Sequence, residues 1–291
     1  MNNNLFCFGY GYTARVLAQR LLKKGWSVAG TARSDEKAAT IETDGGVALR
    51  WNGGAIDPHW IEDATHILIS TPPDNNGCPA FTAAGRTIAK HAAQLKWIGY
   101  LSTNGVYGDH DGAWIDETAA LKPTSDRARR RIRAENEWAR FAKTHGLPLI
   151  IFRLPGIYGP GRSALDAVRQ GKARRVYKKG QVFNRIHVDD IAAALTASMK
   201  NPGVHALYNL ADDEPAPPQD VIDYACRLLD IQPPPLVPLE QAGLSDMAIS
   251  FYTDNKRVSN KRMKDALGVT LTYPTYRDGL RAIMQTGSGC V

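Results

Sequence analysis

The stretch "LFCFGYGYTARVLAQRLLKKG" (residues 5–25) joins an apolar run to an amphipathic one through two glycines. Leu5–Gly9 predicts a strand, and Thr13–Lys24 has the periodicity of a helix. The turn between them fits the pattern G-x-G-x-x-G/A in the strand–turn–helix context that a dinucleotide site requires. Its glycines would let the backbone turn and approach a pyrophosphate at the start of the helix. The expected cofactor-binding residues here are Gly9, Gly11, Tyr12, Thr13 and Ala14.

The pattern of alternating strands and helices continues through the first half of the chain. Further strands are expected at Ser27–Ala32, Val47–Trp51, His66–Ser70, Trp97–Ser102 and Leu147–Leu154, and helices at Ala80–Leu95 and from about residue 124 to 145. This alternation predicts an α/β fold, a doubly wound parallel Rossmann sheet. Beyond Arg153 the chain is rich in turns, which indicates a smaller C-terminal substrate lobe. We expect 1–154 and 186–204 to form the dinucleotide-binding domain, and 155–185 and 205–291 the second lobe.

Composition limits the classes of protein that the chain can represent. Its 291 residues are 43% hydrophobic and 22% charged, as in ordinary globular proteins. No apolar run approaches the ~18 residues that a membrane helix needs, and the start "MNNNLF" has no pattern of a secretion signal. Cys7, Cys78, Cys226 and Cys290 have neither metal-ligand nor disulfide spacing, so we expect a cytoplasmic protein without a metal site. A net charge of +7 favours anionic partners.

The end of the second expected strand bears on the choice of cofactor. NAD-binding units usually place an acidic residue about 20 residues after the glycine turn, on the ribose 2′-hydroxyl. Here the strand ends "VAGTARSDE" and the first charged residue is Arg33, which suits a 2′-phosphate, with the hydroxyls of Thr31 and Ser34 nearby. We therefore predict NADP, with NAD as the second choice. The alternative is that Arg33 is solvated and that Asp35 or Glu36 binds the ribose.

The fourth expected strand runs into "ISTPPDNNG" (residues 69–77). In sheets of this kind, the loops that follow the carboxyl ends of the strands line the cofactor crevice. We therefore expect Ser70 and Thr71 to face the cofactor.

Four later segments carry a family resemblance. They are "YLSTNGVYGD" (100–109), "RLPGIYGPGR" (153–162), "RIHVDDIAAAL" (185–195) and "YNLADDEP" (208–215). In this order and spacing, the chain resembles the extended short-chain dehydrogenase/reductase family, of the NAD-dependent epimerase/dehydratase type. The resemblance implies that a hydroxyl polarises the substrate, that a Tyr exchanges the proton, and that a Lys four residues later holds the nicotinamide ribose. It assigns the hydroxyl to Thr103 and places Pro155 at the cofactor.

The chain departs from that family at the Tyr-x-x-x-Lys pair. Counting back from Glu135 on the long helix places Arg131 at the lysine position and Arg127 at the tyrosine position. No tyrosine lies between Gly108 and Leu154. A guanidinium has no acceptor and stays protonated, so Arg127 is excluded as the acid–base group. Arg131 still has donors for the ribose hydroxyls.

Three residues are candidates to replace the missing tyrosine or to contact the substrate. Tyr107 and Tyr158 lie in segments that approach the nicotinamide in the family, and His187 titrates near neutrality when unperturbed. Each has a structural alternative, in which the tyrosines are packed rings and His187 fixes a loop. In that alternative, Asp189 or Asp190 caps the helix that follows.

Two basic clusters allow several interpretations. One lies on the long helix, and the other is "GKARRVYKKG" (171–180). The three interpretations are faces exposed to solvent, a surface that binds nucleic acid, and residues that border the site of an anionic substrate. We favour the first for most of the arginines and the last for Arg162, and we rank nucleic acid last because no recognition fold is evident.

The sequence therefore predicts an NAD(P)-dependent oxidoreductase or epimerase-like protein that acts on a carbonyl or sugar-like small molecule. The alternative is a catalytically silent NADP-binding sensor or scaffold. Either a monomer or a homodimer is compatible with the sequence.

Overall fold

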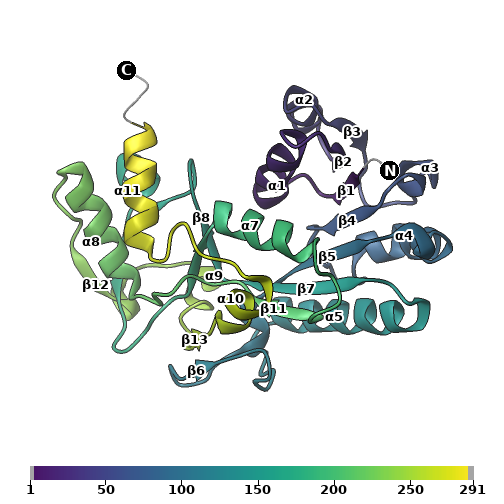
Figure 1. Cartoon of the computed structure of the whole chain (residues 1–291). Helices are drawn as coiled ribbons and strands as arrows, with labels where there is room; N and C mark the ends of the chain where they lie inside the picture. Colours follow the sequence, from purple (N-terminus) through teal and green to yellow (C-terminus); the bar gives the residue numbers. More distant parts are fainter. Residues whose placement is uncertain (1–2, 288–291) are drawn as a thin grey trace.

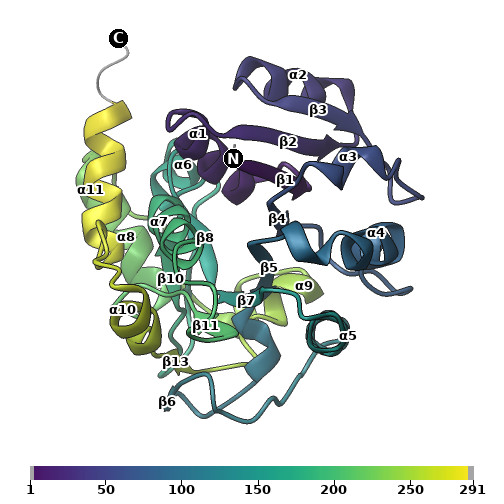
Figure 2. The same ribbon diagram turned by 45° about the vertical axis from the view of Figure 1, so that its right-hand side comes forward.

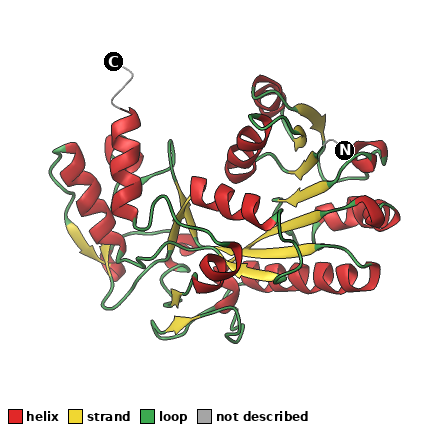
Figure 3. Cartoon of the chain, in the orientation of Figure 1, coloured by secondary structure: helices red, strands yellow, loops and turns green. Residues whose placement is uncertain are grey.

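The computed structural model describes residues 3–287 and confirms the doubly wound α/β fold. Its main sheet has seven strands in the order β11-β7-β5-β4-β1-β2-β3, and every pairing in it is parallel. Figures 1 and 3 show this sheet crossing the right-hand part of the molecule. The strands are β1 (Asn4–Phe8), β2 (Ser27–Ala32), β3 (Val47–Arg50), β4 (His66–Ile69), β5 (Trp97–Thr103), β7 (Leu149–Leu154) and β11 (Leu207–Asn209).

Helices cover both faces of the sheet because the central strands are buried on both sides, as parallel strands usually are. One face packs on α1 (Tyr12–Leu22), α7 (Val188–Ser198) and α10 (Lys261–Leu267). The other packs on α3 (His59–Glu62), α4 (Pro79–Lys90) and α5 (Asp126–His145). Helix α2 (Asp35–Thr43) joins β2 to β3, and short 3₁₀ turns occupy Ala92–Gln94 (η1) and Asn104–Tyr107 (η2).

A second lobe has its own apolar core. Its helices are α6 (Ala164–Arg169), α8 (Pro218–Leu229) and α11 (Tyr276–Gly287), which share buried side chains such as Leu165, Val221 and Leu280. Figures 1 and 2 show α8 and α11 at the opposite end of the molecule from β3. Strand β8 (Gly156–Tyr158) pairs with β10 (Arg185–His187), and β9 (Arg175–Tyr177) pairs with β12 (Leu236–Pro238). Beside them lie η3 (Leu239–Gln241) and α9 (Asp246–Ile249).

The division between the lobes differs from the predicted one in two places. Strand β11, expected in the second lobe, is the edge strand of the main sheet and pairs with β7. Helix α10 contacts α7 and β11, and Met263, Val269 and Leu271 join the core of the first lobe. Between them, β13 (Arg257–Val258) pairs with β6 (Trp114–Ile115). The first lobe therefore continues beyond residue 204 through β11, and the chain returns to it once more at α10.

Three of the cysteines, Cys7, Cys78 and Cys226, are buried free thiols, and Cys290 lies outside the described residues. Across residues 3–287, no helix combines the length and the apolarity that crossing a membrane would require.

Candidate cofactor and substrate site

The glycine turn lies at the point where the direction of strand order reverses. Strand β1 pairs with β2 on one side and β4 on the other, and the turn follows its carboxyl end. Gly9 has a φ of 86°, in the left-handed region where only glycine is unstrained. Its N–H donates to Thr31 Oγ1 at 2.7 Å, and the Ser70 hydroxyl donates to its carbonyl at 2.8 Å. These two hydroxyls therefore hold the turn, whereas they were predicted to face the cofactor.

The start of α1 fits the phosphates of a dinucleotide. Gly11 is the N-cap of α1, and no side chain satisfies the free N–H groups of the first turn. A Cβ placed on Gly11 meets nothing within 4 Å, so a ligand has room against the backbone there. Thr71 Oγ1 is buried and has no hydrogen-bond partner among residues 3–287. Thr13 and Ala14 lie on the buried face of α1, where the helix packs on the sheet.

The residues that follow β2 divide between structure and solvent. Ser34 is the N-cap of α2, and its hydroxyl accepts from the N–H of Lys37 at 3.4 Å, so this hydroxyl already has a structural role. Asp35 lies 3.5 Å from Arg50. Arg33 is exposed, and within the described part of the chain its guanidinium makes no hydrogen bond or ion pair. Arg33 is therefore available to an anion outside the protein.

A cavity of about 740 Å³ opens between the first lobe and the second. Thr103 and Pro155 line it from the carboxyl ends of β5 and β7, and Arg162 lines it from the "YGPGR" loop. Arg162 also lies 5.7 Å from the Tyr12 ring, and the Tyr12 hydroxyl donates to the carbonyl of Pro160 at 3.0 Å. The loop at the cavity therefore touches the start of α1. The other cationic lining residues are Arg127, Arg174, Arg185 and Lys256.

Two predicted catalytic residues do not line this cavity. Tyr107 is fully buried, donates to Asn209 Oδ1 at 2.7 Å and lies under the Arg153 guanidinium at 4.8 Å. Tyr158 donates to the carbonyl of Thr275 at 3.3 Å and faces a second cavity of about 490 Å³. Burial raises the pKa of both phenols, so each keeps its proton. Both tyrosines are packed rings, as in the structural alternative.

His187, predicted to contact the substrate, also has a structural position. Its Nδ1 accepts from the N–H of Asp189 at 3.2 Å, so His187 itself caps α7. Burial lowers the pKa of its imidazole. Asp190, expected as a cap, instead accepts from the N–H groups of Thr272 and Tyr273. This pair of bonds ties the segment before α11 to α7.

The arginines of α5 have separate partners. Arg131 donates to the Tyr100 hydroxyl at 3.2 Å and to the carbonyl of Leu101 at 2.8 Å, not to Glu135. Its guanidinium thus lies beside β5, at the family's lysine position. Arg127 projects toward the cavity and lies 4.6 Å from the ring of Phe251. The cluster on α5 is therefore not one uniform solvated face.

The second basic cluster anchors a segment of the second lobe. Arg174 donates to the carbonyls of Ala242 and Gly243 at 3.2 and 3.3 Å. Arg175 pairs with Asp223, and Lys178 donates to the carbonyl of Tyr252. The bonds of Arg174 and Lys178 hold both ends of residues 242–252, and residues 244–252 provide one wall of the cavity. Most of the cluster is thus structural, and the nucleic-acid interpretation gains nothing from it.

Sequence reasoning missed the part of the site that comes from residues 244–256. Tyr252, Asp254 and Lys256 all line the cavity, together with apolar side chains of the same segment. No motif marks these residues, and about 150 positions separate them from Thr103 in the chain. Only the folded chain brings them to the same cavity.

Comparison with known proteins fits this geometry. Residues 83–211 match the family model described as "NAD dependent epimerase/dehydratase family". Over this stretch, which is less than half of the chain, the sequence resembles that family. Over 98% of its length it is 50% identical to a solved protein of unknown function from Silicibacter pomeroyi, covering 99% of that chain with a TM-score of 0.92.

Two further relatives add limited information. A 3-diazoavenalumate denitrifying reductase from a Streptomyces species is 30% identical over 160 residues, and the match spans 51% of each chain. The dTDP-glucose 4,6-dehydratase from Bacillus anthracis, solved in complex with NAD, is 17% identical, with a TM-score of 0.77 over 100% of this chain and 97% of that one. At that identity the likeness concerns the fold alone.

Proposed function

We propose that this protein is an oxidoreductase or epimerase of the NAD-dependent epimerase/dehydratase type, which prefers NADP and acts on an anionic carbonyl or sugar-like substrate. The observation that carries the proposal is the cavity itself. It begins at Thr103 and Pro155, at the carboxyl ends of two central strands, and its cationic residues outnumber its single carboxylate, Asp254. Ligands of such sheets bind at this edge.

The cavity combines charge with apolar surface. Arg127, Arg162, Arg174, Arg185 and Lys256 supply positive charge around the space, and guanidinium groups suit carboxylates and phosphates. Residues 244–251 contribute an apolar wall in which Met247 and Phe251 are 67% and 50% exposed. We therefore infer a substrate with an anionic group and an apolar or ring-shaped body.

The chain's own residues have distinct roles in this proposal. The free N–H groups that follow Gly11 hold the pyrophosphate, and Arg33 contacts the 2′-phosphate. Thr103 lies at the end of β5, where its hydroxyl polarises the reacting oxygen. Arg131 donates to the ribose from its place beside β5. A bound nicotinamide would supply or accept the hydride.

A silent NADP-binding sensor is the second candidate, and the observation that favours it concerns Arg127 and Arg131. They occupy the family's tyrosine and lysine positions, and Arg131 already donates to Tyr100 and Leu101. Such a protein would keep the glycine turn and lose turnover.

Calorimetric titration with NADPH and with NADH tests the cofactor site. We expect tighter binding of NADPH, and we expect Arg33→Asp to reverse the preference. Lys37→Asp, four residues further along the same loop and helix, is the matched control for a general effect of charge. Failure of both nucleotides to bind would refute the proposal, and binding without turnover of any anionic carbonyl would favour the sensor.

A further inference from the structure

The cavity contains few groups that can exchange a proton at moderate pH. Among the residues that line it, the arginines stay protonated, and the remaining titratable side chains are Tyr252, Asp254 and Lys256. Because neither Tyr107 nor Tyr158 lines the cavity, these three are the groups to consider for the missing acid–base role.

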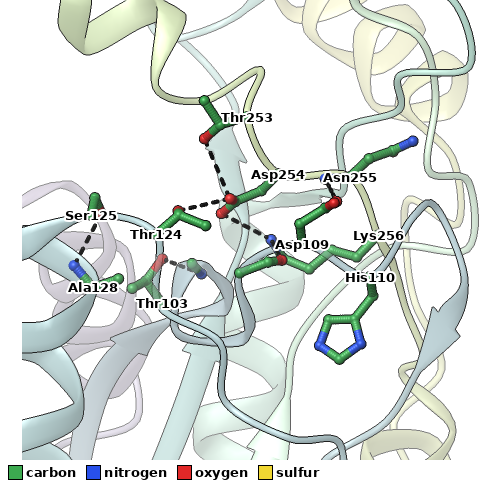
Figure 4. A network of polar contacts seen from close by, with 12 residues as sticks. Thr103, Asp109, His110, Thr124, Ser125, Ala128, Thr253, Asp254, Asn255 and Lys256 are labelled. Atoms are coloured by element: carbon green, nitrogen blue, oxygen red, sulfur yellow. Dashed lines mark hydrogen bonds and ion pairs between the residues drawn. The ribbon is translucent and has the colours of Figure 1, made fainter.

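Lys256 lies next to the turn that begins at Thr103. Its Nζ donates to the carbonyl of Gly108 at 2.7 Å, and Gly108 caps the end of the η2 turn that Thr103 starts. A second contact joins Nζ to Asp254 Oδ2 at 3.4 Å. Figure 4 shows the Lys256 side chain beside Asp254, with Thr103 and Thr124 on the neighbouring strand end and loop. An ammonium has three donors, so one remains for a ligand in the cavity.

Asp254 fixes this arrangement. Its Oδ1 accepts from the Thr124 hydroxyl at 2.8 Å, and Thr124 immediately precedes the N-cap of α5. Asp109, which follows η2, accepts from the N–H of Asn255 at 2.7 Å. The two carboxylates thus dock the 254–256 segment onto the loop and helix that surround Thr103.

We propose that Lys256, oriented by Asp254, is the acid–base group of this site and takes the place of the family's tyrosine. The inference rests on the proposed function. In the reducing direction, an Nζ–H bond breaks as an O–H bond forms on the substrate oxygen that Thr103 polarises. The nitrogen keeps the electron pair as a neutral amine, and it is reprotonated from water. The hydride that reduces the carbonyl carbon of the substrate would come from a reduced nicotinamide.

The electrostatic surroundings agree with this role. Burial lowers the pKa of Lys256, while Asp254 and Asp109 oppose that shift. Arg127 of α5 and Arg185 of β10 face the same cavity, and the His110 ring contacts the carbonyl of Ala120. Tyr252 is less suited, because burial raises the pKa of its phenol and its ring packs on Phe183 at 5.2 Å.

The first test is pulse acetylation of the native protein over a range of pH, read at Lys256 and at the exposed Lys90 by mass spectrometry. Only the neutral amine reacts, so we expect the midpoint for Lys256 to lie below that for Lys90. A midpoint equal to or above that for Lys90, or no labelling of Lys256 before unfolding, would overturn the proposal. Labelling does not require the cofactor, so NADPH binding by the wild type tests the proposed function separately.

The second test compares Lys256→Arg with Tyr252→Phe, using a panel of aromatic and sugar-like aldehydes that carry a carboxylate or a phosphate. Lys256→Arg keeps a cationic donor for Gly108 and Asp254 but cannot release a proton. We expect it to bind NADPH normally and to lose at least about 100-fold in kcat for carbonyl reduction, together with the alkaline limb of the pH profile, because the general acid must be protonated. Tyr252→Phe should lose less in kcat than Lys256→Arg, because its phenol lines the cavity but transfers no proton in this proposal. Loss of turnover in Tyr252→Phe and not in Lys256→Arg would overturn the assignment.

Discussion

Arg153 of β7 and Glu135 of α5 form a two-point ion pair inside the protein. The closest contact joins Arg153 Nη2 to Glu135 Oε2 at 2.7 Å, and the side chains are 6% and 5% exposed. Ser102, the neighbour of Thr103, donates to the same carboxylate, and the guanidinium covers the Tyr107 ring. The pair therefore connects α5, β5, β7 and the η2 turn, which together support one side of the cavity.

Removing one member of this pair should destabilise the fold strongly. Arg153→Met leaves the Glu135 carboxylate buried without its cation, and breaking buried pairs costs about 3–5 kcal/mol. Urea denaturation measures the loss. The double variant Arg153→Met/Glu135→Leu should recover part of it, because no unpaired charge remains. A loss below about 1 kcal/mol in the single variant would contradict this account.

Alanine at the two glycines of the turn should separate stability from cofactor binding. Gly9→Ala forces a Cβ into the left-handed region and against Ser70 and Thr71 at 3.1 Å, so it should cost at least about 1–2 kcal/mol. Gly11 has a φ of −83° and open space, so Gly11→Ala should cost under about 1 kcal/mol.

Both variants should nevertheless bind NADPH more weakly, because the new methyl of Gly11→Ala occupies the place proposed for the pyrophosphate. Parallel thermal melts and calorimetry measure the two effects. Normal NADPH binding by a folded Gly11→Ala variant would place the cofactor elsewhere.

Hydroxyl removal at Thr103 and Tyr107 should have opposite consequences. Thr103→Ala should lower kcat by about 10²-fold or more while the protein still binds NADPH, and Thr103→Ser should restore turnover. Tyr107→Phe leaves Asn209 Oδ1 without its donor in the core and should cost about 1–3 kcal/mol in stability, with kcat little changed. Steady-state kinetics with a carbonyl that the wild type reduces, together with denaturation curves, distinguish these outcomes. Equal losses of kcat in the Thr103 and Tyr107 variants would mean that both side chains affect turnover through the packing of η2.

The buried carboxyl group of Asp212 should make the stability of the fold depend on pH. Burial raises the pKa of Asp212 from its ordinary value of 3.8 to about 8, with Arg185 opposing the shift. Between these two pKa values, the folded state therefore holds a proton that the unfolded state releases. The contribution of Asp212 to the free energy of unfolding is complete below the pKa that its carboxyl has in the unfolded chain. It is lost as pH rises toward 8, by up to about 1.4 kcal/mol per pH unit.

Asp212→Asn should remove this slope, so that the variant gains stability relative to the wild type between pH 5 and pH 8. Urea midpoints over this range measure the difference. A difference that stays constant with pH would mean that Asp212 does not titrate in this window.

The main sheet was largely predictable from local patterns. Strand β2 occupies the predicted Ser27–Ala32, and β1, β3, β4 and β5 each agree to within one residue at either end. Buried parallel strands are continuous apolar runs separated by helices, so their signal is local. Strand β11 has only three residues, too few for a pattern, and it is defined by its pairing with β7.

The site could be predicted only in part, because side-chain roles depend on partners that the sequence does not place. Thr31, Ser34 and Ser70 were grouped with the cofactor by their positions, but the structure gives their hydroxyls backbone partners. Helical spacing alone would place Glu135 beside Arg131, four residues earlier on α5, yet the carboxylate turns inward to Arg153. Glu135 pairs with Arg153 because its carboxylate is buried, and a negative charge inside the protein needs a cation beside it.

The sequence by itself determined the Rossmann sheet, the glycine turn at its head and the family resemblance, because these depend on local patterning and short motifs. The tertiary structure alone decided which groups face the cavity. Lys256 and Thr103 lie about 150 residues apart in the chain, and Asp254 docks on Thr124 from a segment without a motif. Contacts of this kind form when the second lobe closes on the carboxyl ends of the strands, and no local pattern encodes which side chains then meet.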